Sequence, residues 1–191
     1  MRQYVLAGYS QVQGRYAVYR VYIMLAIGKI DLRLKGLKKY LQNIKDAKYE
    51  TQVGIFEEAS YSDGTPVAYV GYLNEYGDHN PPRPFLKRTA DENRDRWCKM
   101  FEGILRSQGI KESSIRAAHD MVGQTASKDV VKTIKAWSPD DPRPNKPATI
   151  AAKARKSAGA KGKNQQGSDP TRVLHDTGVM INSITYKVEH K

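Results

Sequence analysis

Three prolines within four residues, at positions 81, 82 and 84, constrain this chain more than any other feature. Each proline fixes its own φ and disfavours the α region for the residue before it. The backbone therefore approaches Phe85 along a nearly predetermined extended path. We predict that Phe85 and Leu86, at the end of this path, are apolar plugs that bind a neighbouring surface at a low ordering cost.

A strand and a glycine turn are predicted immediately before the proline run. Residues Pro66 to Leu73 alternate bulky apolar and small side chains, which is the period of a half-buried strand. Another strand is predicted at Thr51 to Phe56, and the Asp63-Gly64 pair between the two favours a turn. We therefore expect the two strands to pair antiparallel, with Gly77 turning the chain after the second.

Two long helices are predicted after the proline run. From Phe85 to Leu105 apolar residues recur at helical spacing, and Gly109 ends the pattern. A second apolar face follows, with Ser113 or Ser114 as its cap. A strand at Ile181 to Val188 closes the sheet. The predicted fold class is α+β: a small antiparallel sheet packed against one or two long helices, with a long exposed basic loop.

Composition divides the chain into four segments: an N-terminal extension or arm at 1–28, an α+β core at 29–137, a mobile Pro/Lys/Gly-rich loop at 138–172, and a C-terminal strand completing the core at 173–191. The first segment is rich in tyrosine and valine. It is either an arm that adds a strand to a neighbouring subunit or, if translation of the native gene begins at Met24, an extension that the native chain lacks. A helix with one apolar and one basic face is expected from Asp31 to Ile44.

The chain is strongly basic and has one cysteine. Its net charge of +12 and pI near 9.7 favour association with nucleic acid, an anionic membrane or an acidic protein ring. Cys98 alone excludes an internal disulfide and a cysteine-based zinc cluster. The apolar stretch Ala17 to Ile27 is interrupted by Arg20 and is shorter than the roughly 20 residues that span a bilayer, so no membrane partner is expected.

The loop at 138–172 is the best candidate for contact with DNA or with an acidic partner. In this interpretation its lysine and arginine side chains bind DNA phosphates or the carboxylates of a partner, without recognising a base sequence. The alternative interpretation is a solvated loop that binds no partner. Thr149 to Ser157 favour one or two turns of basic helix, and the loop has no aromatic residue for base stacking. The residues assigned to this contact are Arg143, Lys146, Lys153, Arg155, Lys156, Lys161 and Lys163.

The histidines do not predict a metal site, a cofactor site or a hydrolase. None has a second histidine or cysteine at ligand spacing. Their positions are His79, His119, His175 and His190. His175, Asp176 and Ser183 match a hydrolytic triad in residue type, but no nucleophile elbow accompanies them. We expect Asp176 or Thr177 to cap a helical turn instead.

Three glutamates, Glu57, Glu58 and Glu75, could in principle supply a pair of carboxylates for acid–base chemistry. They lack the aromatic residues or metal ligands that such chemistry needs beside them. Glu75 is expected to hold an arginine or a backbone amide. The sequence therefore predicts a protein that is not an enzyme.

Two motifs resemble the neck and tail-completion proteins of tailed bacteriophages. The first joins Glu75-Tyr76-Gly77 to Pro82-Arg83-Pro84-Phe85, and the second is Asp176-Thr177-Gly178 followed by Ser183. The resemblance covers roughly residues 31 to 188 in outline. It implies that the second motif opens a short helical turn leading into a strand, and that both motifs mark fold and assembly surfaces without catalysis.

The resemblance implies a structural virion protein that forms a homo-oligomeric ring, expected to be a hexamer, at the head-to-tail junction or the upper tail. Its expected partners are neighbouring connector, tail-terminator or tail proteins, with DNA in the channel. Its expected location is the virion, or the host cytoplasm during assembly. The alternative is a sequence-nonspecific nucleic-acid-binding protein that uses the N-terminal helix and the basic loop.

Overall fold

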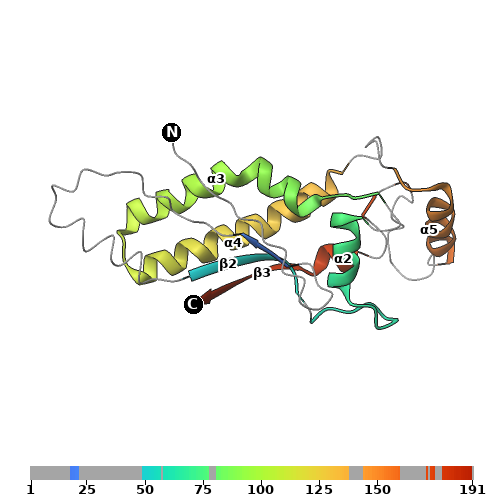
Figure 1. Ribbon diagram of the computed structural model, residues 1–191, viewed down its shortest axis with the longest axis horizontal. Coiled ribbons are helices and arrows are strands. Elements are labelled where there is room, and N and C mark those ends of the chain that lie inside the picture. The colour runs from blue at the N-terminus through green and yellow to red at the C-terminus, as the bar shows by residue number, and fades with distance from the viewer. Residues whose placement is uncertain are drawn as a thin grey trace.

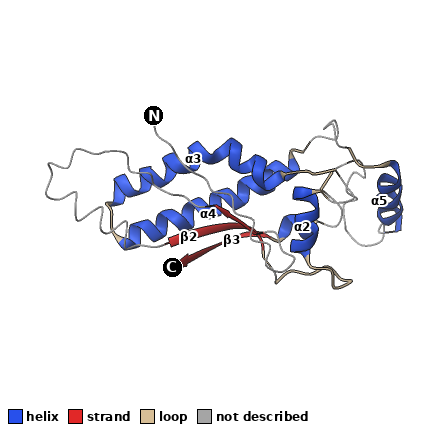
Figure 2. Cartoon of the chain, viewed as in Figure 1, coloured by secondary structure: helices blue, strands red, loops and turns tan. Residues whose placement is uncertain are grey.

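The computed structural model describes residues 18–21, 49–56, 58–77, 81–137, 144–159, 171, 173–174 and 178–190, with 18–21 and 156–159 described by their backbone alone. Within these ranges the elements are, in chain order, β1 (Val18–Val21), β2 (Tyr49–Ile55), α2 (Val67–Tyr76), α3 (Phe85–Gln108), α4 (Glu112–Lys135), α5 (Pro147–Gly159), α6 (Val179–Asn182) and β3 (Ile184–His190). Figure 1 traces this order, and Figure 2 separates helices from strands.

A sheet, α4 and α3 form three successive layers. The strand order in the sheet is β1-β2-β3, and both pairings are antiparallel. α4 lies across β2 and β3, and α3 runs back along α4 on the side away from the sheet (Figure 1). α2 and α6 pack together at one end, and α5 stands beyond them. The predicted α+β class, with a small antiparallel sheet and two long helices, is confirmed.

The two long helices bury apolar rows whose members recur every three or four residues. The rows are Trp97, Phe101 and Leu105 on α3, and Ile115, Ala118, Val122, Ala126, Val130 and Ile134 on α4. Gly109 ends α3 as predicted; its φ of 76° costs a glycine little. The predicted serine cap of the second helix is wrong, because α4 already begins at Glu112 and Ser114 is buried within it.

α4 crosses the sheet closely at Gly123. A β-carbon at this position would lie 2.9 Å from Cγ2 of Thr51 on β2 and would overlap the ring of Tyr186 on β3. Gly103 on α3 differs, because a β-carbon added there would have no atom within 4 Å. Only the first of these two helical glycines is required by packing.

The strand predicted at Pro66 to Leu73 is wrong, because this segment forms helix α2. Its buried residues share one helix face: Val67, Ala68, Gly71 and Glu75. Gly71 allows α2 to approach the sheet, since a β-carbon there would lie 2.8 Å from Cδ1 of Ile55. The predicted pairing of this segment with β2 is therefore also wrong, and β2 pairs with β1 and β3.

The Asp63-Gly64 turn is confirmed, although it leads into a helix. The backbone N–H of Tyr61 donates to the carbonyl of Thr65 at 2.8 Å, and the N–H of Thr65 donates to Oδ1 of Asp63 at 2.9 Å. The aspartate thus closes the turn with its own side chain, as Asx turns do.

The ends of the chain differ from expectation in detail. Within the predicted N-terminal arm, β1 pairs with β2 of this chain's own sheet, and the rest of the arm lies outside the described residues. The predicted C-terminal strand is present as β3 but begins at Ile184, because α6 precedes it. The predicted basic helix is confirmed as α5, which begins with a proline, a residue suited to a first helical position. The helix predicted from Asp31 to Ile44 lies outside the described residues.

Candidate functional site

The two sequence motifs, which are far apart in the chain, meet around α2. α2 packs against α6 and against α3. The first motif supplies the end of α2 and the start of α3, while the second supplies α6 with Gly178 and Ser183 at its two ends. Asp176 and Thr177 of the second motif lie outside the described residues.

Glu75 joins α2 to α3 through its carboxylate. The backbone N–H of Leu86 donates to Oε2 at 2.9 Å, and that of Lys87 donates to Oε1 at 3.0 Å. The N-cap residue of α3, Pro84, provides no side-chain cap. First-turn N–H groups have no partner inside a helix, and the helix dipole favours an anion beside them. Glu75, which is 2% exposed, caps α3 from outside, and the predicted backbone-amide contact is confirmed.

The proline run carries the chain from α2 to α3 along a fixed path. Gly77 has a φ of 75°, and its N–H donates to the carbonyl of Leu73 at 3.0 Å. The N–H of Arg83 donates to the carbonyl of Asn74 at 2.6 Å, which brings the chain back against the last turn of α2. The start of α3 is thereby aligned with the carboxylate of Glu75.

Phe85 and Leu86 fill this chain's own core, so the predicted plug into a neighbouring surface is wrong. Phe85 is 0% exposed, and Leu86 is also buried. The extended path ends inside the molecule because Glu75 holds the first turn of α3 against α2. The outer part of the run is Pro82, which is exposed.

Arg83 forms a clamp at the base of the basic segment. Its buried guanidinium donates from Nη2 to the carbonyl of Pro144 at 3.2 Å and to Oδ1 of Asn145 at 3.5 Å. Nδ2 of Asn145 in turn donates to the carbonyl of Thr171 at 3.3 Å. The two ends of the segment that contains α5 therefore meet beside the proline run.

α6 is a single turn bounded by two motif residues. Gly178 enters it with a φ of 78°, and the hydroxyl of Ser183 donates to the carbonyl of Val179 at 2.8 Å. Met180 and Ile181 are buried. The helical turn leading into a strand, which the resemblance implied, is confirmed. Ser183 is a helix-end residue, while His175 and Asp176 of the triad considered from sequence lie outside the described residues.

The tyrosine face, which we define as Tyr69, Tyr72 and Tyr76 on the outer side of α2, was not predicted. Tyr69 is 38% exposed, Tyr76 is 39% exposed, and Tyr72 between them is half-buried. The ring centroids of Tyr72 and Tyr76 are 4.8 Å apart. The face carries no charge, because Glu75, the one charged residue of α2, is buried. The i, i+3, i+7 spacing reveals this face once the segment is known to be helical.

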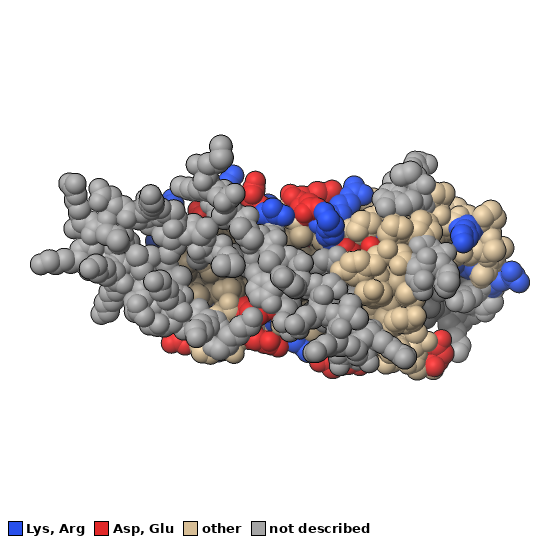
Figure 3. Space-filling view, in the orientation of Figure 1, with Lys and Arg blue, Asp and Glu red and all other residues tan. Residues whose placement is uncertain are grey.

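Some of the basic residues predicted to contact DNA or an acidic partner lie in the described part of the chain. Lys146 and Arg155 are exposed, Lys153 is half-buried, and α5 contains no acidic residue. Figure 3 shows basic side chains over α5 at the end of the molecule. The backbone alone is described for Lys156, and the predicted residues outside the described ranges are Arg143, Lys161 and Lys163.

A polar groove of about 450 Å³ lies between α3 and α4. Its lining residues are Arg88, Glu92, Asn93, Arg96, Asp129, Lys132, Thr133 and Ala136. Arg96 pairs with Asp129 across the two helices, and Asp129 also accepts a hydrogen bond from Nε1 of Trp97 at 2.8 Å. Within α3, Nε of Arg88 lies 2.9 Å from Oε1 of Glu92. The Arg96–Asp129 pair ties the two helices together, whereas the Arg88–Glu92 pair lies within α3.

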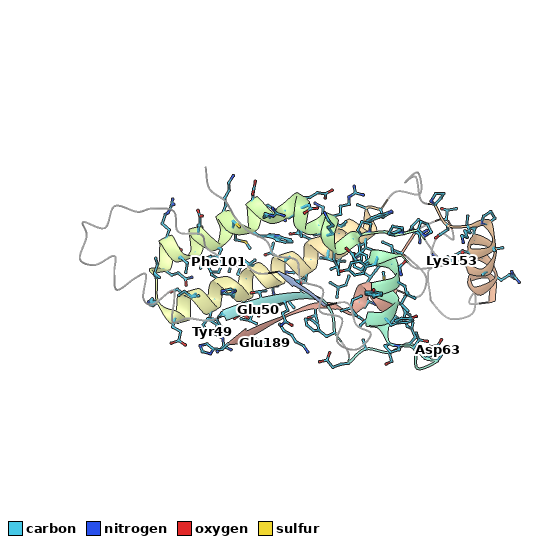
Figure 4. All side chains as sticks on the ribbon, in the orientation of Figure 1. Tyr49, Glu50, Asp63, Phe101, Lys153 and Glu189 are labelled. Carbon is cyan, nitrogen blue, oxygen red and sulfur yellow. The ribbon has the colours of Figure 1, made fainter. Side chains whose placement is uncertain are left out.

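His119 is a buried residue whose role was not predicted. Its Nδ1 lies 2.8 Å from Oγ1 of Thr51, and its ring meets that of Phe101 edge-on at 5.0 Å. Figure 4 labels Phe101, which projects between the long helices, and Tyr49, whose ring lies 6.0 Å from the imidazole. Burial lowers the pKa of His119 to about 4, so its imidazole is neutral at pH 7 and belongs to the core.

No protein-family model matches this chain, and no curated protein or solved structure matches it. Among the residues that the structure describes, no three His, Cys, Asp or Glu side chains are grouped to hold a metal ion. In the same part of the chain, no helix has the length and apolar character to cross a membrane.

Proposed function

We propose that this chain is a structural, non-catalytic protein of a tailed-phage or prophage particle. Identical copies form a ring at the head-to-tail junction or the upper tail, contacting neighbouring connector, tail-terminator or tail proteins. The chain is made in the host cytoplasm and ends in the virion. It uses no cofactor.

The observation that supports this proposal is the convergence of both motifs on α2. The polar groups of the motifs that the structure describes make contacts within the chain: Glu75 caps α3, Arg83 clamps the basic segment and Ser183 closes α6. Residues engaged in this way position elements of a scaffold. The family resemblance assigns such residues to fold and assembly, and the contacts fit that role.

A second candidate is a sequence-nonspecific nucleic-acid-binding protein. The observation that favours it is α5, which carries Lys153 and Arg155 with no acid, beside exposed Lys146. Phosphate contacts by such residues lose affinity steeply as salt rises. Both candidates allow contact with DNA, in the channel of the ring for the first and directly for the second, so the test must separate self-assembly from DNA binding.

The test is the mass of the purified chain in solution, measured by light scattering after size exclusion over a range of protein and salt concentrations, with and without duplex DNA. A discrete ring-sized species that persists in salt and forms without DNA supports the virion ring. A protein that is monomeric alone, and whose mass rises only when DNA is added at low salt, supports the second candidate. The variant Lys146→Gln/Lys153→Gln/Arg155→Gln, which lacks the exposed cations, should then show no rise in mass when DNA is added. A monomer under every condition contradicts a self-assembling ring.

A further inference from the structure

We propose that the tyrosine face of α2 is a docking surface for helix α5 of a second copy of this chain. The inference rests on the proposed self-assembly and identifies the two surfaces that carry it. One surface is aromatic and uncharged, and the other is a basic, alanine-rich helix.

The tyrosine face has the chemistry of a protein-binding surface. Tyrosine presents a large apolar area with few rotatable bonds and a hydroxyl at its edge, and it is enriched among residues that dominate binding energy. Tyr72 and Tyr76 support each other through their ring contact, so part of the face is already ordered before binding. The π faces of tyrosines also attract lysine and arginine cations.

Helix α5 has the complementary chemistry. Its sequence, PATIAAKARKSAG, combines small side chains, which allow close approach, with three cations and no acid. None of its described side chains is buried, and it makes no extensive packing contact with any other described element. An isolated helix of 13 residues is marginal in water, so a helix of this length gains stability from a surface to pack against.

The position of α5 favours a second copy over its own α2. Arg83 holds Pro144, just before α5, at 3.2 Å beside the start of α3, and from there α5 projects beyond the end of the molecule (Figures 1 and 4). α2 and α5 of one chain do not pack extensively on each other. A contact between two different surfaces repeats from copy to copy, and it closes into a ring if the rotation between copies divides the full circle.

The first experiment replaces Tyr69 by photoreactive p-benzoylphenylalanine in the full chain and irradiates a mixture of ¹⁴N-labelled and ¹⁵N-labelled protein. Mass spectrometry is expected to join position 69 to a peptide from α5, with cross-linked pairs that carry one light and one heavy partner. Two results would overturn the inference. One is cross-links to α5 with a single label throughout, which would place α5 on its own chain. The other is cross-links confined to segments other than α5.

The second experiment compares the dissociation constants for self-association of the wild type and three variants. Tyr69→Ala/Tyr76→Ala removes the exposed rings, and Met121→Ala, at a residue 51% exposed on α4, is the control that removes apolar area elsewhere. The tyrosine variant should self-associate about 10- to 100-fold more weakly with unchanged helix content, and the control should match the wild type. Lys153→Glu/Arg155→Glu on α5 should weaken self-association similarly.

The outcomes separate this inference from the proposed function. A ring that survives the tyrosine substitutions overturns the docking surface and leaves the virion ring standing. A cross-linked pair of copies that never closes into a ring keeps the docking surface and contradicts the ring. A wild-type monomer at every concentration overturns both.

Discussion

Replacing Gly123 by alanine is expected to destabilise the chain, whereas replacing Gly103 by alanine is expected to stabilise it. Both residues lie inside 24-residue helices, α4 and α3, so both changes gain about 0.5–1 kcal/mol of helix propensity. At Gly103 nothing opposes the gain, because no atom lies within 4 Å of the added methyl group.

At Gly123 the same methyl group meets the sheet. It would lie 2.9 Å from Cγ2 of Thr51 and would overlap the ring of Tyr186, so at least one of these side chains must move. Overpacking of this kind costs about 1–3 kcal/mol. Thr51 is restrained by its contact with His119 at 2.8 Å, and loss of that hydrogen bond costs about 1 kcal/mol more. After the propensity gain, the net loss is about 1–3 kcal/mol.

Urea titration followed by circular dichroism measures both variants against the wild type. The midpoint should rise for Gly103→Ala and fall for Gly123→Ala, with equal slopes. For a chain of this length, thermal midpoints should move by about 2–4 °C per kcal/mol. The close crossing of α4 over the sheet would be refuted if Gly123→Ala were as stable as Gly103→Ala.

Three other changes have defined outcomes. Glu75→Gln places an amide donor against the first turn of α3 and should lower the free energy of unfolding by about 2–4 kcal/mol. Glu92→Gln, which removes one partner of an exposed ion pair, should change the free energy of unfolding by less than about 1 kcal/mol. Equal effects of the two changes in urea titration would contradict the capping role of Glu75. The pKa of His119 is about 4 in the folded chain and 6.5 in the unfolded chain, so the unfolded chain binds more protons between these pH values. The free energy of unfolding should therefore fall by on the order of 3 kcal/mol as the pH is lowered from 6.5 to 4. His119→Gln should remove this dependence of stability on pH, and a dependence that persists in the variant would assign it to other groups. Arg83→Gln should speed tryptic cleavage between residues 144 and 171 with little change in helix content, and an unchanged rate would show that the clamp is dispensable.

The long helices could be predicted because periodicity over 24 residues averages out individual exceptions. α2 could not, because its ten residues cover fewer than three turns and its outer face bears tyrosines where a surface helix usually bears charges. β-forming residue types then dominated the prediction. Its helical state depends on contacts with α6 and Ile55, which no local window contains.

The site could be predicted in part for the same reason. The contact of Glu75 with a backbone amide was one of the two contacts expected for this carboxylate, the other being with an arginine. The burial of Phe85 did not follow, because the direction of its side chain depends on how α2 and α3 are joined. His119 gave no signal, because its partner Thr51 is 68 residues away in the chain.

Because of the Arg83 clamp, the segment between Asn145 and Thr171 can differ in length and charge while the rest of the fold is kept. The chain leaves and rejoins the body at one point, which is fixed by hydrogen bonds from Arg83 and Asn145. Closing a longer loop from fixed ends costs only about 0.6 kcal/mol for each doubling of its length. Chains with the same three layers can therefore carry a longer, shorter or differently charged helix at this position, which alters what the protein meets outside itself while its own folding stays the same.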